Sequence, residues 1–340
     1  MKILSTNIES HNDSEISDPY ALIERPVVSV LMLAYNHGPY LAQAIDSVLE
    51  QQYDVPLELL IGEDCSSDNT REIALRYQKK YPETIRVFLS DRNIGSTLNH
   101  RRLLLAARGE FYAYLDGDDY WLPNKLARQI KYLQEDTHCS AVFTNALTIN
   151  HSGQYIGLFN DAGNKCLDLG ELVRNGNFLN NSSMLYRATS RDALLSVKVP
   201  SIDYRGHLLL ARTGFLKHIS EPLTAYRIGS TASMIMHDNH RVRQLYWEAL
   251  ASVPHELVTH NELAQGIADF MRRIFYHGLR MGRLRLLGEW APLAFATSPY
   301  GTIRTALLII SSIIRAGCKE LYGRMRKGPD GRPAKVLYRC

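Results

Sequence analysis

Three aspartates crowd together directly after an apolar segment of the chain. Asp116, Asp118 and Asp119 lie within four residues, and the run at residues 111–115 before them is typical of a buried strand. Carboxylates this close together repel one another unless a cation lies between them. Oxygen ligands of this kind suit Mg²⁺ or Mn²⁺, which proteins bind through one or two carboxylates together with substrate phosphates. The cluster therefore predicts a divalent-cation site for a phosphorylated ligand.

Two other interpretations of this cluster need to be weighed. A calcium-binding EF-hand loop would have glycine at its sixth position and glutamate at its twelfth. Counted from Asp116, those positions hold Trp121 and Ala127, which excludes such a loop. An ordinary acidic turn between a strand and a helix is common, so the case for a cation site depends on the elements around the cluster.

The surrounding sequence alternates between predicted strands and predicted helices. Apolar, β-branched runs indicate buried strands, and apolar residues three and four positions apart indicate amphipathic helices. Alternation of the two with short loops is typical of βαβ units on a parallel, doubly wound sheet. The predicted strands cover residues 27–33, 57–61, 85–89, 111–115 and 141–144, and the predicted helices cover residues 40–52, 69–80, a segment that ends near 108, and 123–135.

The loops that follow these strands carry polar residues. Because right-handed crossovers place every strand-to-helix loop at the same edge of the sheet, Tyr35, Asp64 and Asn93 should line one crevice with the aspartate cluster. Ligands of open α/β sheets bind in that crevice. The first loop, residues 34–38, lacks the Gly-x-Gly-x-x-Gly pattern of dinucleotide sites, and the chain has no Gly-Lys-Ser/Thr phosphate loop. An NAD-dependent enzyme is therefore not expected.

Charge and cysteine content limit the possible ligands and the cellular compartment. The chain has 340 residues and a net charge of +4, but residues 301–340 hold nine Lys/Arg and two Asp/Glu, which leaves 30 Lys/Arg against 33 Asp/Glu before them. A main body with no basic excess gives no case for a nucleic-acid-binding protein. Five scattered cysteines and a polar N-terminus without an apolar segment fit a reducing, cytoplasmic compartment.

Four motifs resemble those of family 2 glycosyltransferases with the GT-A fold, both in their residues and in their order along the chain. They are residues 28–36, residues 61–70, Asn93-x-Gly95 and residues 115–121, and the likeness runs from near residue 27 to near residue 235. The resemblance implies an α/β fold with a Rossmann-like, doubly wound, mostly parallel sheet and helices on both faces. We expect a disordered or loosely packed lead-in (1–25), a nucleotide-sugar-binding half (26–145), an acceptor half (146–235) and a helical C-terminal region with a basic tail (236–340).

The resemblance also implies roles for individual residues. Tyr35 would pack near the nucleotide base, Asp64 would accept a hydrogen bond from that base, and Asp116 would lie near the ribose and diphosphate. Asp118 would bind the divalent metal, Mn²⁺ or Mg²⁺, with Asp116 beside it. The residues expected at the nucleotide sugar are Ala34, Tyr35, Asn36, Glu63, Asp64, Asn93, Gly95, Asp116, Gly117 and Asp118.

Two departures from the family pattern affect recognition of the base. Many members carry glycine where Cys65 stands, and many have Arg-Asn-x-Gly before the aspartate cluster, where this chain has His-Arg-Arg-Leu at residues 100–103. We therefore assign the base-recognition role of the family's arginine to no residue of this segment. Beyond the motifs, His237 or His240 could complete the metal shell or contact the phosphates, and the alternative is a solvated loop histidine.

The second half of the chain resembles the segment that places the family's catalytic base. Asp203 matches that base, although it could instead cap the helix that follows. Residues 180–187, which include Asn181 and Ser182, would line the acceptor side. Trp121 could stack against a sugar, or it could pin its loop to the core.

Together these features predict an inverting glycosyltransferase. It would move a sugar from a nucleoside diphosphate sugar, with UDP as the expected nucleotide, to a hydroxyl of a glycan or lipid-linked acceptor. The resemblance suggests surface-polysaccharide assembly at the inner face of a bacterial plasma membrane. One alternative is a nucleotidyltransferase, although the basic, glycine-rich loop usual after its first strand is absent. The other is a non-catalytic protein that binds nucleotides or carbohydrates, and the aspartates at 64, 116, 118 and 203 argue against it.

Residues 241–340 are expected to be mostly helical. Residues 306–314 are strongly apolar, but Arg304 and Arg315 bracket them, and a helix needs about 20 apolar residues to span a bilayer. An apolar helical stripe beside a basic segment is typical of helices that lie on an anionic membrane surface. The alternative is a helix packed on the catalytic domain with a solvated tail.

Overall fold

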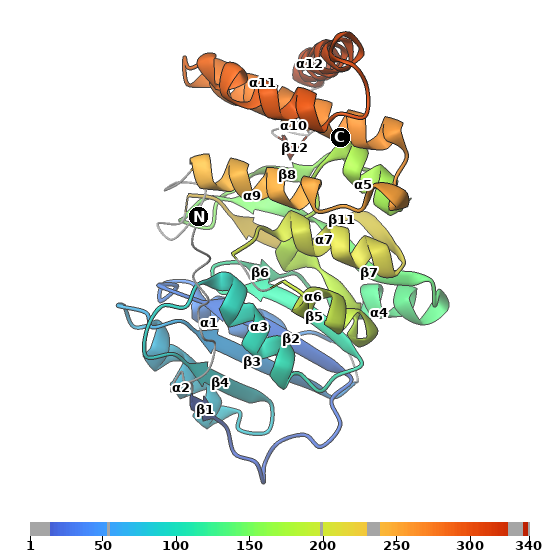
Figure 1. The fold of residues 1–340 in the computed structure, drawn as a ribbon. Coiled ribbons are helices and arrows are strands. Elements are labelled where there is room, and N and C mark those ends of the chain that lie inside the picture. The colour runs from blue at the N-terminus through green and yellow to red at the C-terminus, as the bar shows by residue number, and fades with distance from the viewer. Residues whose placement is uncertain (1–13, 53–54, 198–199, 230–238, 326–335, 339–340) are drawn as a thin grey trace, which may run out of the picture.

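One mixed β-sheet with helices on both faces runs through the molecule (Figure 1). The computed structural model describes residues 14–52, 55–197, 200–229, 239–325 and 336–338. Within these ranges the sheet has twelve strands. The N-terminal part, blue in Figure 1, lies at the opposite end of the molecule from the orange and red C-terminal helices.

The N-terminal half of the sheet is parallel and buried on both faces. Its centre is β2 (Val28–Ala34), which pairs with β3 (Leu57–Glu63) on one side and β5 (Phe111–Asp116) on the other, while β4 (Ile85–Leu89) extends the sheet beyond β3. All seven residues of β2 are buried because helices cover both faces, which is why the strand is apolar without alternation. The predicted parallel, doubly wound sheet is confirmed.

The four predicted helices are all present on this half. Each is slightly shorter than expected because turns occupy the end residues. Three of them pack on the face that includes Met32, and the third in chain order packs on the face that includes Leu31. The observed bounds are α1 (Leu41–Leu49), α2 (Thr70–Lys80), α3 (Ser96–Ala106) and α4 (Lys125–Glu135).

The second half of the sheet leads the chain back to the aspartate cluster. β10 (Leu185–Arg187) runs antiparallel between β5 and β7 (Cys139–Ile149), and β7 pairs in parallel with the long β11 (Phe215–Arg227). Near its end β11 also pairs with β6 (Tyr120–Trp121), which directly follows the aspartates. The strand predicted at 141–144 is therefore present but longer, and β11 closes over the acidic loop.

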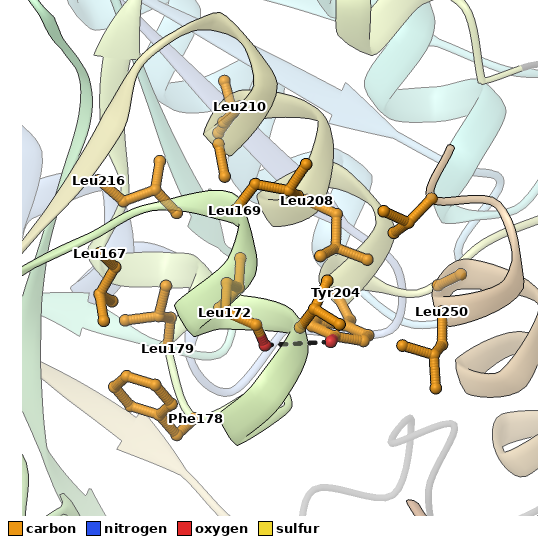
Figure 2. Packing of buried hydrophobic residues seen from close by; sticks show 14 of the residues in the cluster. Leu167, Leu169, Leu172, Phe178, Leu179, Tyr204, Leu208, Leu210, Leu216 and Leu250 are labelled. Carbon is orange, nitrogen blue, oxygen red and sulfur yellow. Dashed lines mark hydrogen bonds between the residues drawn. The ribbon is translucent and has the colours of Figure 1, made fainter. Parts of the chain in front are cut away.

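A buried cluster fixes the helix that begins at Asp203. α7 (Asp203–Thr213) and α5 (Leu169–Asn175) contribute side chains to the same core, which Figure 2 shows from close by. The Tyr204 hydroxyl donates a hydrogen bond of 3.1 Å to the carbonyl oxygen of Leu172, drawn as a dashed line in Figure 2. The first turn of α7 is thereby tied to α5.

The C-terminal region is helical, as expected, but it also returns to the sheet. Its helices are α9 (Asn239–Ala251), α10 (His260–Arg280), α11 (Arg285–Thr297) and α12 (Thr302–Met325). β12 (Val336–Tyr338) then pairs in parallel with β8 (Tyr155–Asn160), a strand that the expectation of a mostly helical region with a basic tail did not include. In the described part of the chain, every helix is too short or too polar to cross a bilayer.

The disordered or loosely packed lead-in expected over residues 1–25 is wrong for residues 14–16, and residues 1–13 lie outside the described part of the chain. β1 (Ser14–Ile16) adds an antiparallel edge strand to β4, and Arg86 of β4 binds Glu15 at 2.8 Å. Arg86 also reaches the buried Glu58 at 3.0 Å. A three-residue polar segment carries no periodic signal, so this strand depends on a partner distant in sequence.

Candidate active site

A large cavity opens where the parallel strands end. Its volume is about 1550 Å³, and its walls include Ala34 at the end of β2, Asp64 after β3 and Asp116 at the end of β5. Other walls carry Asn181, from a short 3-10 turn, and Asp203, at the start of α7. The strand-end loops therefore meet at one cavity, at the edge where open α/β sheets bind their ligands.

Most of the residues predicted for the site line this cavity. They are Ala34, Tyr35, Asp64, Asn93, Gly95, Asp116, Asp118, Asn181, Ser182 and Asp203. Asn36, Glu63, Gly117 and Trp121 are outside the lining. His237 lies outside the described residues, and the ring of His240 lies 6.4 Å from that of Trp290, away from the lining.

Asn36 and Glu63 shape the loops rather than the cavity wall. The Asn36 side chain accepts a hydrogen bond from the Ser67 backbone N–H at 2.8 Å, which joins the first loop to the second. Glu63 is fully buried and accepts hydrogen bonds from the Ser66 backbone N–H at 2.6 Å and Arg71 Nε at 2.7 Å. Both side chains hold the segments that present Tyr35 and Asp64.

Asp64 joins the second loop to the third. Its Oδ1 accepts a hydrogen bond from the Ile94 N–H at 2.8 Å, and its Oδ2 accepts one from the Gly95 N–H at 2.9 Å. Burial raises the pKa of Asp64, and the two backbone hydrogen bonds oppose that rise because they stabilise the carboxylate. A carboxylate oxygen accepts more than one hydrogen bond, so Asp64 keeps acceptor capacity for a ligand.

Cys65 adopts a backbone conformation that suits glycine. Its φ is 59°, in the left-handed region that residues with a Cβ atom rarely adopt. This conformation gives a physical reason for the glycine that the family resemblance leads us to expect at this position.

Asp119, although part of the cluster, does not line the cavity. It is buried and accepts hydrogen bonds from Ser182 Oγ at 2.6 Å and the Arg227 backbone N–H at 2.8 Å. It therefore joins the acidic loop to the 3-10 turn and to the closing strand β11.

Asp116 and Asp118 are the cluster members that line the cavity. Asp116 accepts a hydrogen bond from the Tyr114 hydroxyl at 2.8 Å. Burial raises the pKa of Asp116 to about 8, and the negative charges of Asp118 and Asp203 add to the rise. His37 Nε2 lies 3.9 Å from Asp118 Oδ1, and the buried His37 Nδ1 has no hydrogen-bond partner among the described residues.

These side chains fit a divalent cation. Two carboxylates are the hard oxygen ligands that Mg²⁺ and Mn²⁺ take, and a cation would offset the repulsion that adds to the effect of burial on the pKa of Asp116. In the ranges that the structure describes, no three His, Cys, Asp or Glu side chains form a complete metal shell. The remaining ligands would have to come from substrate phosphates and water, as is usual for Mg²⁺.

Asp203 reaches the cavity from the first turn of α7. Ile202 occupies the N-cap position of this helix and its side chain makes no cap bond, so the alternative that Asp203 is the N-cap residue is wrong. The Asp203 side chain is accessible and lines the cavity. Loss of surrounding water nevertheless raises its pKa to about 6. A carboxylate with this pKa can both hold and release a proton near neutral pH.

His207, one helical turn after Asp203, supports the acceptor side. It is buried, and its ring nitrogens lie 3.1 Å from Asn177 Oδ1 and 3.2 Å from Asn181 Oδ1. Burial lowers the pKa of His207 to about 3, so the ring is neutral at physiological pH. His207 therefore positions Asn177 and Asn181, which both line the cavity.

Trp121 and Gly117 have packing roles. Trp121 is 3% exposed, its Nε1–H donates to the Ser182 carbonyl oxygen at 2.8 Å, and Lys125 Nζ lies 4.0 Å from its ring centre. Of the two interpretations of Trp121, the structure favours a pin for the loop over a stacking surface for a sugar. A Cβ atom at Gly117 would lie 3.0 Å from the Leu33 carbonyl oxygen and 2.8 Å from His37 Nδ1, so the close approach requires glycine.

Sequence comparison finds similarity to a known family. Residues 29–175 match the model of glycosyl transferase family 2. This segment of the chain is therefore similar to family 2 glycosyltransferases. An uncharacterized Mycobacterium tuberculosis protein is 31% identical over 223 residues, which are 65% of this chain and 64% of that protein. TuaG of Bacillus subtilis, provisionally named a teichuronic acid biosynthesis glycosyltransferase, is 29% identical over 209 residues, 60% of this chain and 80% of TuaG.

The fold has relatives among solved structures. Residues 1–349 of Staphylococcus aureus TarS, crystallised with UDP-GlcNAc, superpose with a TM-score of 0.59 at 16% identity, covering 88% of this chain and 93% of the TarS chain. The expected GT-A fold is thereby confirmed.

The chain spans 64% of the length of its Mycobacterium relative, so the match describes only part of that protein.

Sequence reasoning missed several residues that contribute to the cavity. His37 directly follows Tyr35 and Asn36 in the first loop, so its position there was the available signal. Tyr226 lines the cavity from β11, and only its pairing with the acidic loop reveals this. His207 lies outside the lining but positions Asn177 and Asn181, which belong to it. Its spacing of four residues from Asp203 was only a weak indication of this supporting role.

Proposed function

We propose that this chain is an inverting, metal-dependent glycosyltransferase that moves a sugar from a nucleoside diphosphate sugar to an acceptor hydroxyl. The main support for the proposal is that two kinds of carboxylate, a cation-binding pair and a candidate base, line the same cavity. Asp116 and Asp118 form a repelling pair that suits a cation, and Asp203 lies near enough for its charge to act on Asp116. UDP is the proposed nucleotide, supported by the UDP-GlcNAc complex of TarS.

The donor would occupy the wall formed by the strand ends. Tyr35, 37% exposed, offers a ring to the base, and Asp64 offers carboxylate oxygens held by two backbone N–H groups. Asn93 and Gly95 line the same wall. Asp118 and Asp116 would hold Mn²⁺ or Mg²⁺, which when bound neutralises the charge that grows on the departing diphosphate.

Asp203 would act as the general base. Its carboxylate would accept the proton of the acceptor hydroxyl while that oxygen bonds to the anomeric carbon and the bond to the diphosphate breaks. A single displacement of this kind inverts the anomeric centre and needs no covalent enzyme intermediate. Positioned general bases contribute roughly 10²–10⁴-fold to the rate.

An isosteric variant separates catalysis from binding. Asp203→Asn should lose about 10²-fold or more in turnover of a UDP-sugar while UDP affinity stays unchanged. Asp192→Asn is a matched control, because Asp192 is exposed on α6 (Arg191–Leu195) outside the cavity lining. If Asp203→Asn retains wild-type turnover, Asp203 is not the base; if the wild type binds UDP but transfers no sugar to any acceptor, a nucleotide-binding protein is the better description.

We also propose that α12 lies on an anionic membrane surface. One face of this helix packs on α10, whereas Ile303, Leu307, Ile310, Ile314 and Leu321 are each more than half exposed at spacings of three, four and seven residues. The segment 301–340 carries seven more Lys/Arg than Asp/Glu. Exposed apolar side chains beside basic residues favour the interface of an anionic bilayer.

Vesicle sedimentation tests this second proposal. The protein should sediment with vesicles that contain anionic phospholipid and not with purely zwitterionic ones, and Ile310→Ser with Ile314→Ser should weaken sedimentation. Leu105→Ser is the control, since Leu105 is equally exposed on α3. Dimerisation through the stripe, seen as a doubled mass in light scattering that the double variant abolishes, would contradict the proposal.

A further inference from the structure

The cavity continues past Asp203 into a region that the proposed chemistry does not use. Its walls there come from α9, α10, α12 and β12, and they carry many cationic side chains. Among the described residues, Asp269 is the one acidic side chain on these walls, whereas the donor wall has Asp64, Asp116 and Asp118. The two parts of one cavity therefore have opposite charge.

The cationic side chains exceed what the local acids neutralise. Asp269 binds both Arg272 and Arg273, and Arg174 lies 3.5 Å from Glu262. Arg280 and Arg315 also line the cavity, both side chains are exposed, and neither has an ion-pair partner among the described residues. Arg243 and Lys319, each of which has an interaction partner, line the same walls.

The pKa of His277 is consistent with a positive electrostatic potential in this region. Burial lowers the pKa of His277, and the positive charges of Arg243 and Arg280 lower it further. The His277 side chain lines the same cavity. The contribution of the two arginines to this shift comes from their positive potential, which would also favour an anionic ligand.

The position of this region relative to Asp203 identifies the ligand as the acceptor. If the donor diphosphate lies by Asp116 and Asp118, the acceptor hydroxyl must reach Asp203 from another side of the cavity. The other walls carry Asn177 and Asn181 near Asp203 and, farther along, the cationic side chains together with apolar and aromatic ones such as Phe270. An acceptor that extends from Asp203 along this cavity would therefore reach the cationic walls.

We propose, resting on the glycosyltransferase function above, that the acceptor carries a phosphate group and that Arg280 and Arg315 bind it. Guanidinium groups bind phosphate through paired, charge-assisted hydrogen bonds. Arg280 lies on α10 and Arg315 on α12, so the site forms where these two packed helices border the cavity. The exposed apolar stripe on α12 lies on the same helix, and it would bring this phosphate site close to a lipid surface.

Titration calorimetry on the full chain, with UDP and Mn²⁺ at saturation, tests the proposal. Farnesyl phosphate should bind with the donor site filled, and farnesol should not. Arg280→Gln and Arg315→Gln should each weaken farnesyl phosphate binding about tenfold, the loss expected for one charge-assisted hydrogen bond. Arg304→Gln is the matched control, because Arg304 is exposed on α12, lies over the Tyr300 ring and is outside the cavity lining.

Inorganic phosphate distinguishes the two sources of the group. Tighter binding of farnesyl phosphate than of inorganic phosphate supports a lipid-linked acceptor, and equal binding supports a soluble phosphorylated glycan. The proposal is overturned if neither probe binds once UDP is present, or if both arginine variants bind farnesyl phosphate like the wild type. Absence of UDP binding in the first titration would instead refute the proposed glycosyltransferase function.

Discussion

Asp116 should destabilise the metal-free protein, and this effect should depend on pH. The unfolded chain loses the Asp116 proton near pH 4, whereas the folded protein keeps it to about pH 8. The folded state therefore binds more protons than the unfolded state between these values. By linkage, this group lowers the free energy of unfolding as the pH rises from about 4 to about 8.

The size of the effect follows from the two pKa values. A folded-state pKa of about 8 against an ordinary value of 3.8 corresponds to about 6 kcal/mol when both states are ionised. Asp116 keeps contact with water in the cavity, so we expect a smaller part of this, about 1–2 kcal/mol at pH 8. For a chain of this size that equals a change in melting temperature of about 2–4 °C.

Asp116→Asn removes the charge and keeps an oxygen that can accept the Tyr114 hydrogen bond. In chelator-treated protein, the variant should melt about 2–4 °C above the wild type at pH 8 and together with it at pH 4.5, measured by calorimetry. UDP with Mn²⁺ should reverse the order, because the wild type gains a bound metal and the variant does not. Asp192→Asn should show no such pH dependence. A difference that does not change with pH, or a variant that is less stable at pH 8 without metal, would refute this reasoning.

Three further predictions follow from single residues. The pKa of Asp203 is about 6, and its ionised form accepts the proton. The value of kcat should therefore fall about tenfold per pH unit below 6 and level off above 7. A pH profile of kcat that stays flat down to pH 4.5 would exclude Asp203 as the base. Cys65→Gly should stabilise the protein by up to about 1 kcal/mol in urea unfolding, because φ 59° suits glycine, and a destabilised variant would contradict that. Tyr204→Phe should cost about 1 kcal/mol through the lost bond to Leu172, and an unchanged urea midpoint would show that the bond does not hold α7.

The sequence predicted the donor half well because its determinants are local. Each apolar run from β2 to β5 is buried on both faces, and each helix has its own apolar face. Crossover handedness then brings the loops that hold Tyr35, Asp64 and Asp116 together without further information.

The acceptor half depends on contacts that local patterns do not encode. The pairing of β11 with β6, which brings Tyr226 to the cavity, joins segments about one hundred residues apart. Trp121 was ambiguous because burial and ligand stacking favour the same residue type. β12 and the cationic walls from α10 and α12 also escaped prediction, because no motif links residues near 280, 315 and 338.

The central claim is that this cavity binds a nucleoside diphosphate through a metal held by Asp118. The measurement that tests it most directly is the melting temperature of the full chain with UDP alone, Mn²⁺ alone and both together, for the wild type and Asp118→Ala. A ligand present at 100 times its dissociation constant adds about 2.7 kcal/mol to stability. We predict a rise of several degrees for the wild type only when UDP and Mn²⁺ are both present, and none for Asp118→Ala. A wild type that does not respond to the pair, or a variant that responds equally, would contradict the account.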